Sequence, residues 1–190
     1  MKNLFLLAGL FFSVSAINAQ YQLVKGTQIA GLQTTLAAGD GYATKLYWTN
    51  GSDHNGYGIN LVPTYGYTLA RNWVVGGTVT LGYSREKYGQ TFSNEVYHDY
   101  DLGLAPFTRL YLDISKNGHF KLFGLASVEF VTTKETINYP NSSVSYTWHN
   151  SFAAVGGGFA YFSNKLVFDL NVSGAGLRFG VYKTFGGVKR

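Results

Sequence analysis

The sequence predicts an all-β chain, an eight-stranded antiparallel up-and-down transmembrane β-barrel preceded by a cleaved signal peptide. Three observations predict this fold. Residues alternate with period two in eight segments, the connections between these segments alternate in length, and one face of the segments is apolar. The 24 glycines, 15 tyrosines and 14 phenylalanines agree with strands, because aromatic side chains suit a pleated surface and glycine suits tight bends.

The first nineteen residues have the pattern of a secretory signal. Lys2 precedes an apolar run from Leu4 to Phe12, and small residues follow as far as Ala19. We therefore expect residues 1–19 to be removed and residues 20–190 to form one outer-membrane barrel domain. The absence of cysteine excludes a disulfide framework, a lipid-attachment site and thiol chemistry. After the signal, no window approaches the roughly 20 apolar residues that a membrane-spanning helix needs.

The eight strands are predicted from alternation that is bounded by glycine, asparagine, aspartate and serine clusters. They are Gly26 to Ala37, Tyr57 to Leu69, Trp73 to Ser84, Glu95 to Leu112, His119 to Thr133, Tyr146 to Phe162, Lys165 to Ser173 and Gly176 to Phe185. Long loops follow the first, third and fifth strands, and tight turns follow the second, fourth and sixth. This alternation is typical of a closed barrel with short periplasmic turns and longer outer loops.

The hairpin from Pro63 to Ser84 indicates which face meets the membrane. Its large residues, such as Tyr65, Trp73 and Leu81, lie opposite a face that is nearly all glycine and threonine. A soluble ligand-binding barrel would place the large residues inside, around a cavity. The glycine and threonine face is a poor water-facing surface, however, and it fits the narrow interior of a small barrel. The sequence therefore predicts an apolar exterior in contact with lipid.

The same alternation assigns the charged and aromatic side chains. Four acids and three bases are expected to form an interior charge network: Asp99, Asp101, Arg109, Lys121, Glu129, Asp169 and Arg178. Within it, the parity of the last turn sets Arg178 opposite Asn171 and diagonal to Asp169. We therefore expect contact between Arg178 and Asp169 in one network, with Arg109 and Glu129 drawn in from other strands. Two lipid-facing aromatic girdles are expected: Tyr65, Tyr67, Trp73, Phe120, Tyr161 and Phe185 at the short-turn end, and Tyr57, Tyr83, Tyr100 and Phe130 at the long-loop end. The alternative is an antiparallel sandwich with scattered surface aromatics.

Three stretches carry a family resemblance: PTYGY at Pro63, APFTRLY at Ala105 and GLRFGVYKTF at Gly176. With them the mature chain resembles the small eight-stranded outer-membrane β-barrel domains of Gram-negative bacteria, similar to the transmembrane domain of OmpA-like proteins. The resemblance implies a cell-envelope location and folding by the barrel-assembly machinery. Two features depart from the family pattern. Phe185 is followed by GGVKR instead of ending the chain, and SGAG replaces an often long last loop.

Three alternatives to a structural role concern catalysis, metal binding and transport. His149 and Ser151 are similar to the His-x-Ser pair of some eight-stranded lipid A deacylases, with Glu135 as the only orienting carboxylate in reach. Glu95, His98, Asp99 and Asp101 contain metal-ligand types, but alternation points His98 away from both aspartates. A small-solute pore is the third alternative, although side chains nearly fill an eight-stranded lumen.

The sequence therefore predicts a structural or adhesive role, exercised through outer loops such as KLYWTNGSDHN, and no catalysis. We expect no cofactor and no metal. The expected partners are outer-membrane lipid, lipopolysaccharide and the barrel-assembly machinery, and the chain is expected to be a monomer. Nucleic acid is not expected, because the net charge of +5 is mild and the basic residues are scattered.

Overall fold

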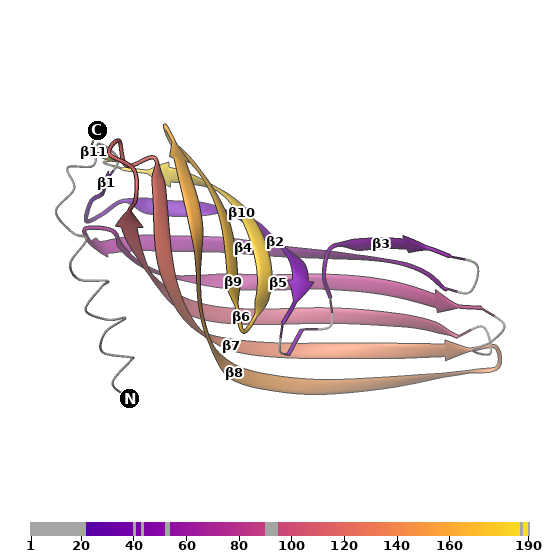
Figure 1. The fold of residues 1–190 in the computed structure, drawn as a ribbon. Coiled ribbons are helices and arrows are strands. Elements are labelled where there is room, and N and C mark those ends of the chain that lie inside the picture. Colours follow the sequence, from indigo (N-terminus) through magenta and orange to yellow (C-terminus); the bar gives the residue numbers. More distant parts are fainter. Residues whose placement is uncertain are drawn as a thin grey trace, which may run out of the picture.

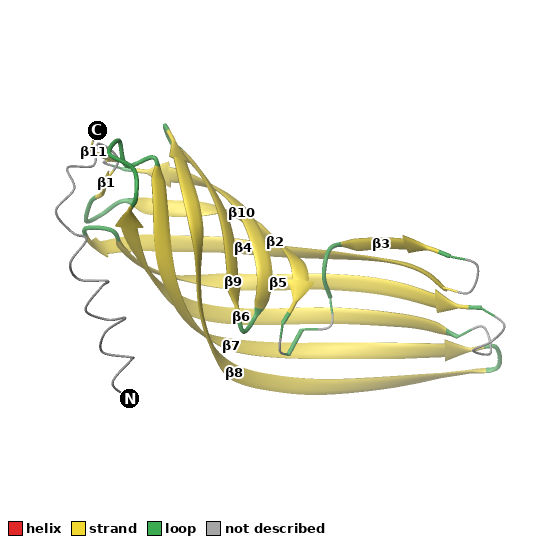
Figure 2. Cartoon of the chain, in the orientation of Figure 1, coloured by secondary structure: helices red, strands yellow, loops and turns green. Residues whose placement is uncertain are grey.

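The computed structural model describes residues 22–39, 41–42, 44–51, 54–89, 95–186 and 188–189. The predicted signal peptide lies outside the described residues. Strands and turns make up the described chain (Figures 1 and 2). The strands are β1 (Gln22–Leu23), β2 (Gln28–Ala38), β3 (Tyr47–Asn50), β4 (His54–Ala70), β5 (Trp73–Tyr88), β6 (Val96–Asp113), β7 (Phe120–Tyr139), β8 (Ser142–Ser163), β9 (Leu166–Ser173), β10 (Gly176–Phe185) and β11 (Val188–Lys189).

Eight antiparallel strands close into a barrel. Neighbours in sequence pair from β4 through to β10, and β2 closes the ring by pairing with β10 on one side and β4 on the other. The predicted eight-stranded fold is therefore confirmed. Two short ladders are added to it: β3 pairs with β4, and β1 pairs with β11 at the opposite end of the barrel (Figure 1).

The barrel strands differ strongly in length. β9 and β10 end early, at a two-residue turn, whereas β4 to β8 continue past them as an open sheet (Figure 1). The predicted long loops are therefore largely wrong, since β7 and β8 pair without interruption up to Tyr139 and Ser142. The segment KETINY…SSVSYTWH keeps alternating small polar, β-branched and aromatic residues, which favours strand, and the loop shrinks to Pro140 and Asn141.

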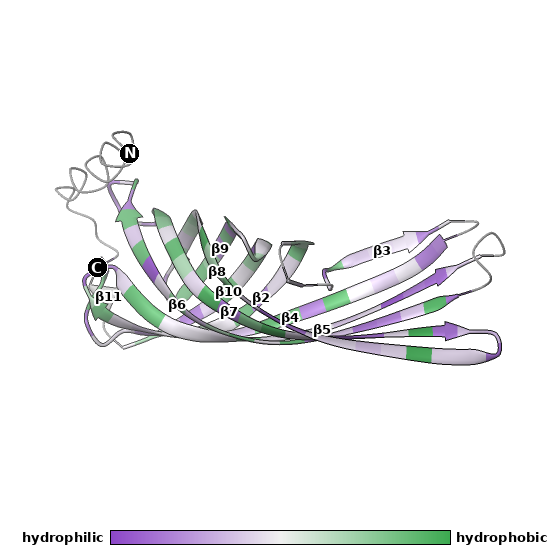
Figure 3. Ribbon diagram, turned by 90° about the horizontal axis from the view of Figure 1, so that it is seen from below, coloured by the Kyte–Doolittle hydropathy of each residue, from purple (hydrophilic) through white to green (hydrophobic). Residues whose placement is uncertain are grey.

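The barrel is apolar outside, and its interior holds buried charged side chains together with an apolar cluster. Leu102, Leu104 and Val172 are each more than half exposed, while Arg109, Lys121 and Glu129 are almost completely buried. In Figure 3 the green hydrophobic bands concentrate on the barrel, and the far ends of the long strands are mostly pale and purple. Closure pairs the backbone groups between neighbouring strands, which is the condition for spanning a bilayer with strands.

The predicted girdle residues lie on this exterior. All ten except Tyr83 are exposed, and Tyr83 is half-buried against Tyr57, whose ring centroid is 6.0 Å away, and Tyr100, at 5.1 Å. Among the described residues, no helix is long and apolar enough to cross a membrane.

Close approach between strands depends on glycine at inward positions of β8. A Cβ atom at Gly156 or Gly158 would collide with the backbone oxygen of Val172 or Leu170 on β9. These glycines lie where β8 begins to pair with β9, between the open sheet and the closed barrel. Glycine is therefore required where the sheet bends to close.

Candidate functional site

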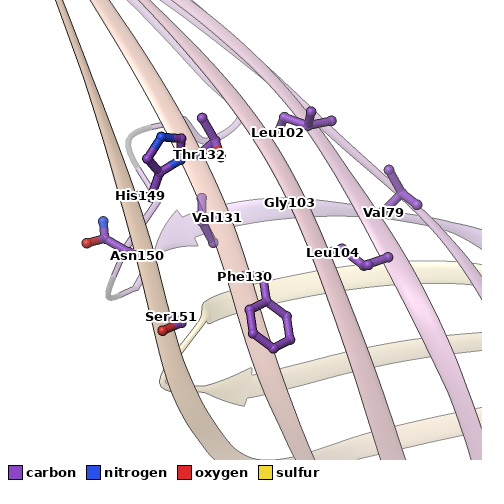
Figure 4. A pocket seen from close by; sticks show the side chains of 10 residues that line it. All are labelled: Val79, Leu102, Gly103, Leu104, Phe130, Val131, Thr132, His149, Asn150 and Ser151. Atoms are coloured by element: carbon purple, nitrogen blue, oxygen red, sulfur yellow. Dashed lines mark hydrogen bonds between the residues drawn. The ribbon is translucent and has the colours of Figure 1, made fainter.

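His149 and Ser151, the residues of the alternative catalytic interpretation, lie on the outward face of β8 (Figure 4). His149 and Ser151 line a shallow surface groove together with the apolar side chains of Leu102, Leu104 and Phe130. The ring nitrogen Nδ1 of His149 is 2.8 Å from the hydroxyl oxygen of Thr132. This groove is therefore a depression in the lipid-side surface of the sheet.

Glu135 lies on the other face of the sheet. It is directly opposite Tyr146 in the β7–β8 ladder, whereas His149 is opposite Thr132. An odd-numbered and an even-numbered residue of β7 point to opposite faces, because successive side chains alternate along a strand. The structure therefore does not bring His149, Ser151 and Glu135 together as a catalytic triad.

The weighed metal ligands are also divided between the two faces. His98 is outward, with Nδ1 3.0 Å from the Tyr83 hydroxyl, while Asp99 and Asp101 point inward. Within the described part of the chain, no three histidine, aspartate or glutamate side chains are grouped as metal ligands would be.

Six of the seven residues assigned to the interior network are buried in the lumen: Asp101, Arg109, Lys121, Glu129, Asp169 and Arg178. Arg109 Nη1 donates to Asp169 Oδ2 at 2.6 Å, and Arg178 Nη2 is 3.8 Å from Glu129 Oε2. Lys121 forms an ion pair with Asp113. Most lumen charges are thus held in pairs, as burial in a dry interior requires.

The predicted register is found, and Arg109 and Glu129 take part from other strands as expected, but the ion pairs are Arg109–Asp169 and Arg178–Glu129 instead of Arg178–Asp169. Arg178 does lie opposite Asn171, as turn parity indicated. The partners of both charges come from across the lumen, however, with Arg109 on β6 reaching Asp169 and Glu129 on β7 reaching Arg178. In a narrow barrel, contacts across the lumen compete with diagonal contacts along the wall.

The predicted placement of Asp99 in the lumen is wrong. It points inward, but it lies beyond the closed barrel, is half-buried, and accepts a hydrogen bond from Ser84 Oγ at 2.8 Å. Alternation gives the face of a strand on which a side chain lies. It does not say where along the strand the barrel stops being closed.

Tyr42 and Thr44, which lie between β2 and β3, are buried at the outer end of the lumen. The Tyr42 hydroxyl donates to Glu129 Oε2 at 2.5 Å, and its ring packs edge-on against Phe152 at 6.3 Å. The backbone N–H and the hydroxyl of Thr44 both donate to Asp101 Oδ2 at 2.8 Å. This part of a predicted outer loop is instead a plug.

The inner end of the lumen is filled by apolar side chains and by the N-terminal segment. Leu23 is 1% exposed, and its backbone N–H donates to Asn72 Oδ1 at 3.2 Å. Leu23 belongs to a cluster of buried hydrophobic residues: Leu23, Ile29, Val74, Phe107, Tyr111, Phe123, Leu125, Ala160, Phe162, Val167 and Tyr182. Because both ends are packed, the geometry disfavours the pore alternative.

The open part of the sheet is the most distinctive feature of the described molecule. We call it the protruding sheet: β3 with the parts of β4 to β8 that lie beyond Tyr83, Tyr100 and Lys134 (Figure 1). β8 pairs with β9 only from Gly156 onward. From Ser142 to Val155, one edge of β8 therefore faces no described strand, and its backbone groups are open to a new one.

The inner face of the protruding sheet, continuous with the lumen, carries aromatic rings and carboxylates. The hydroxyls of Tyr47 and Tyr88 each donate to a carboxylate oxygen of Glu86 at 2.7 Å. Further along the sheet, Tyr146 is 52% exposed and Trp148 38% exposed. Their alternation with Phe152, which contacts Tyr42 in the lumen, places both on the inner face.

Asp99 and Glu135 face each other directly on β6 and β7 of this surface. Burial raises the pKa of each carboxyl. The negative charge of Asp99 raises the pKa of Glu135 further, and the charges of Asp101 and Glu86 raise that of Asp99, whereas the hydrogen bond from Ser84 and the nearby His98 lower it. Burial also acts to raise the pKa of Glu86, but the hydrogen bonds from Tyr47 and Tyr88 and the nearby His54 outweigh it, so the pKa of Glu86 is lowered. Glu86 is thus stabilised as an anion, whereas burial disfavours the ionised forms of Asp99 and Glu135, and the charge of Asp99 also opposes the ionisation of Glu135.

The outer face of the protruding sheet has the opposite character. Arg85, Lys87, His98 and Lys134 occupy outward positions there, next to the lipid-facing girdle residues. The sheet is therefore basic on the face that continues the membrane surface and acidic on the face that continues the lumen.

Comparisons with known proteins are restricted to structures, since no family model and no curated protein matches the chain. The crystal structure of Ail, the attachment invasion locus protein of Yersinia pestis, is 19% identical, covers 85% of this chain and 100% of its own, and has a TM-score of 0.45. The structure of the same protein in a phospholipid bilayer nanodisc is 18% identical, covers 86% of this chain and 100% of its own, and has a TM-score of 0.38. The crystal structure of the beta domain of the Bordetella autotransporter BrkA is 14% identical, covers 88% of this chain and 59% of its own, and has a TM-score of 0.36. At these TM-scores the similarities carry no argument about what this chain does.

The closed eight-stranded barrel, with its apolar exterior and its buried charges inside, makes the chain a small outer-membrane β-barrel. Sequence reasoning missed the plug residues Tyr42 and Thr44 and the inner-face residues Tyr146 and Glu135 as parts of one surface. For Tyr146, the alternation in SYTWH indicates a strand and therefore a position on one face of the sheet. Nothing in the loop sequence around Tyr42 marks it as buried.

Proposed function

We propose that this outer-membrane barrel is a surface-contact protein, and that its protruding sheet binds an extended segment of a partner polypeptide along the free edge of β8. The observation that carries the proposal is the unpaired edge from Ser142 to Val155. An exposed edge strand offers a row of N–H and C=O groups, which is the template for adding a strand from another chain.

Which backbone groups are available follows from the ladder. The backbone N–H of Phe162 donates to the carbonyl of His119, on the β7 side, at 2.7 Å. Donors alternate in direction along a strand, and the β7–β8 register is continuous. The N–H groups of odd-numbered residues, including Ser145, therefore point to the free edge.

Ser145→Pro tests the proposal, because proline removes a donor on the free edge while the ladder to β7 stays intact. A short peptide of alternating threonine and glutamine should bind the barrel in lipid vesicles, and Ser145→Pro should weaken binding about tenfold or more. Fluorescence anisotropy of labelled peptide measures this. The control Ser145→Ala removes the same hydroxyl, which is 2.9 Å from that of Thr136, but keeps the N–H. Equal binding by both variants contradicts edge pairing.

The basic outer face supports lipopolysaccharide as a neighbour of the same barrel. Arg85 and Lys134 lie just beyond the lipid-facing girdle, where phosphate groups of an outer-leaflet lipid would meet them. Replacing both with glutamine should weaken association with lipid A vesicles relative to phosphatidylcholine vesicles. Folding by the barrel-assembly machinery and a monomeric state stay predictions.

A further inference from the structure

The inner face of the protruding sheet presents a row of side chains that ends at the free edge. Tyr146 on β8 is opposite Glu135 on β7, Glu135 is opposite Asp99 on β6, and Asp99 is opposite Ser84 on β5. A strand added to β8 would extend this row by one position next to Tyr146. The chemistry of the row therefore limits which side chains such a strand can carry there.

Two like charges stand side by side in this row. Directly opposite carboxylates destabilise a pair of strands, and Asp99 and Glu135 occupy such a position. Among the described residues, Ser84 donates a hydrogen bond to Asp99, and neither carboxylate has a lysine or arginine within ion-pairing distance. In the lumen, by contrast, Asp169 and Glu129 each have an arginine within ion-pairing distance. The protruding sheet thus has an uncompensated negative charge beside its open edge.

The aromatic rings of the same surface add a second attraction for cations. Tyr146 and Trp148 lie on the strand that forms the edge, and both are exposed. The face of a tyrosine or tryptophan ring attracts an ammonium or guanidinium group. The two cationic or protonatable side chains described near this surface lie at its far edge: Lys45 over the ring of Tyr47, and His54 stacked on Tyr88.

We propose that the partner segment is cationic, with lysine or arginine at alternate positions, and that its side chains lie over Tyr146 and Trp148 toward Glu135 and Asp99. This inference rests on the proposed function and names the partner's chemistry. Neighbouring strands lie roughly 5 Å apart, so Glu135 is about 10 Å from the axis of an added strand. The long stem of a lysine or arginine crosses one strand, packs on the ring and reaches the carboxylate.

A metal ion is the other cation that carboxylates attract, and the described residues argue against it. They contain no group of three histidine, aspartate or glutamate side chains placed to coordinate one. Carboxylates on adjacent strands next to exposed rings suit an organic cation, which needs fewer oxygen ligands than a hard divalent ion.

Three short peptides test the proposal, with threonine alternating with lysine, glutamine or glutamate. Each is titrated onto the full barrel in phosphatidylcholine vesicles, which carry no net charge. The lysine peptide should bind about tenfold more tightly than the glutamine peptide, and the glutamate peptide most weakly. Asp99→Asn combined with Glu135→Gln should remove most of this difference, and Tyr146→Leu should remove part of it. Retention of the barrel fold is checked by heat-modifiable gel mobility.

Lys134→Gln is the matched control, since it changes the net charge by one unit on the opposite face of β7. A preference set by overall charge would rise in Lys134→Gln as much as it falls in Glu135→Gln, and this result overturns the proposal. Equal binding of all three peptides that is still lost in Ser145→Pro overturns the cationic partner but leaves edge pairing standing. Binding of the lysine peptide that depends on the carboxylates but not on Ser145 supports the cationic partner and contradicts edge pairing. No binding by any peptide overturns both.

Discussion

The inward-facing carboxylates of this chain lie in two regions, the closed lumen and the protruding sheet, and they are treated differently in each. In the lumen, Asp169 contacts Arg109 at 2.6 Å, and Glu129 accepts hydrogen bonds from Tyr42 and Ser127 beside Arg178. On the protruding sheet, Asp99 and Glu135 face each other with no base between them. Glu129 and Glu135 both lie on β7, so strand identity does not explain the difference.

Access to water does explain it. An unpaired charge in a closed interior costs several kcal/mol, so a lumen keeps only charges that it pairs. The protruding sheet is open along one edge, where solvent screens like charges and their repulsion is small. We infer that paired charges hold the barrel together, and that unpaired charges on the open sheet are available to a ligand.

The largest expected effect comes from breaking a lumen pair. Arg109→Met should destabilise the barrel by about 3–5 kcal/mol, because it leaves Asp169 buried without its partner. Unfolding in urea from lipid vesicles measures the loss. Adding Asp169→Leu should recover much of it, since an apolar pair of similar volume replaces the ion pair. A loss below about 1 kcal/mol in the single variant contradicts the view that lumen pairs stabilise the barrel.

The second effect contrasts the outer surfaces of the two regions. Leu104→Arg should cost about 2–4 kcal/mol, because Leu104 is 57% exposed on the lipid-facing side of the barrel. Asn138→Arg, at an outward position near the tip of β7, should change stability by less than about 0.5 kcal/mol. Urea unfolding of both variants gives the comparison. Equal costs would mean that the lipid boundary lies beyond Lys134.

A double-mutant cycle sharpens the account of the lumen. Arg109→Gln with Asp169→Asn should show a coupling of about 1 kcal/mol or more, as expected for contacting buried groups. Arg178→Gln with Asp169→Asn should be additive within about 0.5 kcal/mol, because Arg178 lies toward Glu129. Coupling in the second cycle and additivity in the first would restore the pairing that turn parity predicted.

Most of the barrel could be predicted from the sequence, because alternation and turn spacing are local signals. Asp101, Arg109 and Glu129 are inward for that reason, and the left-handed Gly118, with φ of 68°, marks a turn. Contacts across the lumen could not be predicted. Which arginine contacts Asp169 depends on the diameter of the closed barrel and the tilt of its strands. Neither quantity can be deduced from the sequence of a single strand.

The protruding sheet and the plug residues Tyr42 and Thr44 were not predicted from the sequence, for different reasons. Serine, threonine and asparagine between Lys134 and Ser145 suggested a loop by composition, although the alternation continued and was the better guide. Tyr42 lies in a glycine- and alanine-rich connection with no periodicity. Its burial against Phe152 and Glu129 follows only from the closed tertiary structure.

The smallest expected effect concerns Glu135, and its sign separates the two regions. The pKa of Glu135 is raised, first by burial and then by the charge of Asp99, so the folded chain favours the protonated form. Folding stability from this group is therefore highest in acid and declines as pH rises from the ordinary value of about 4 through the raised pKa. Near pH 7, Glu135→Gln should be slightly more stable than the native chain, by less than about 0.5 kcal/mol.

That small gain should vanish near about pH 3, where both carboxyls are protonated. Glu86→Gln provides the opposite sign: the pKa of Glu86 is lowered, so its contribution is present above the ordinary value and is lost as pH falls through the lowered one. Urea unfolding at the two pH values measures both variants. A Glu135→Gln variant that is less stable than the native chain at neutral pH would mean that Glu135 is already paired in the folded protein. The inner face would then resemble the lumen, and its charge would be structural.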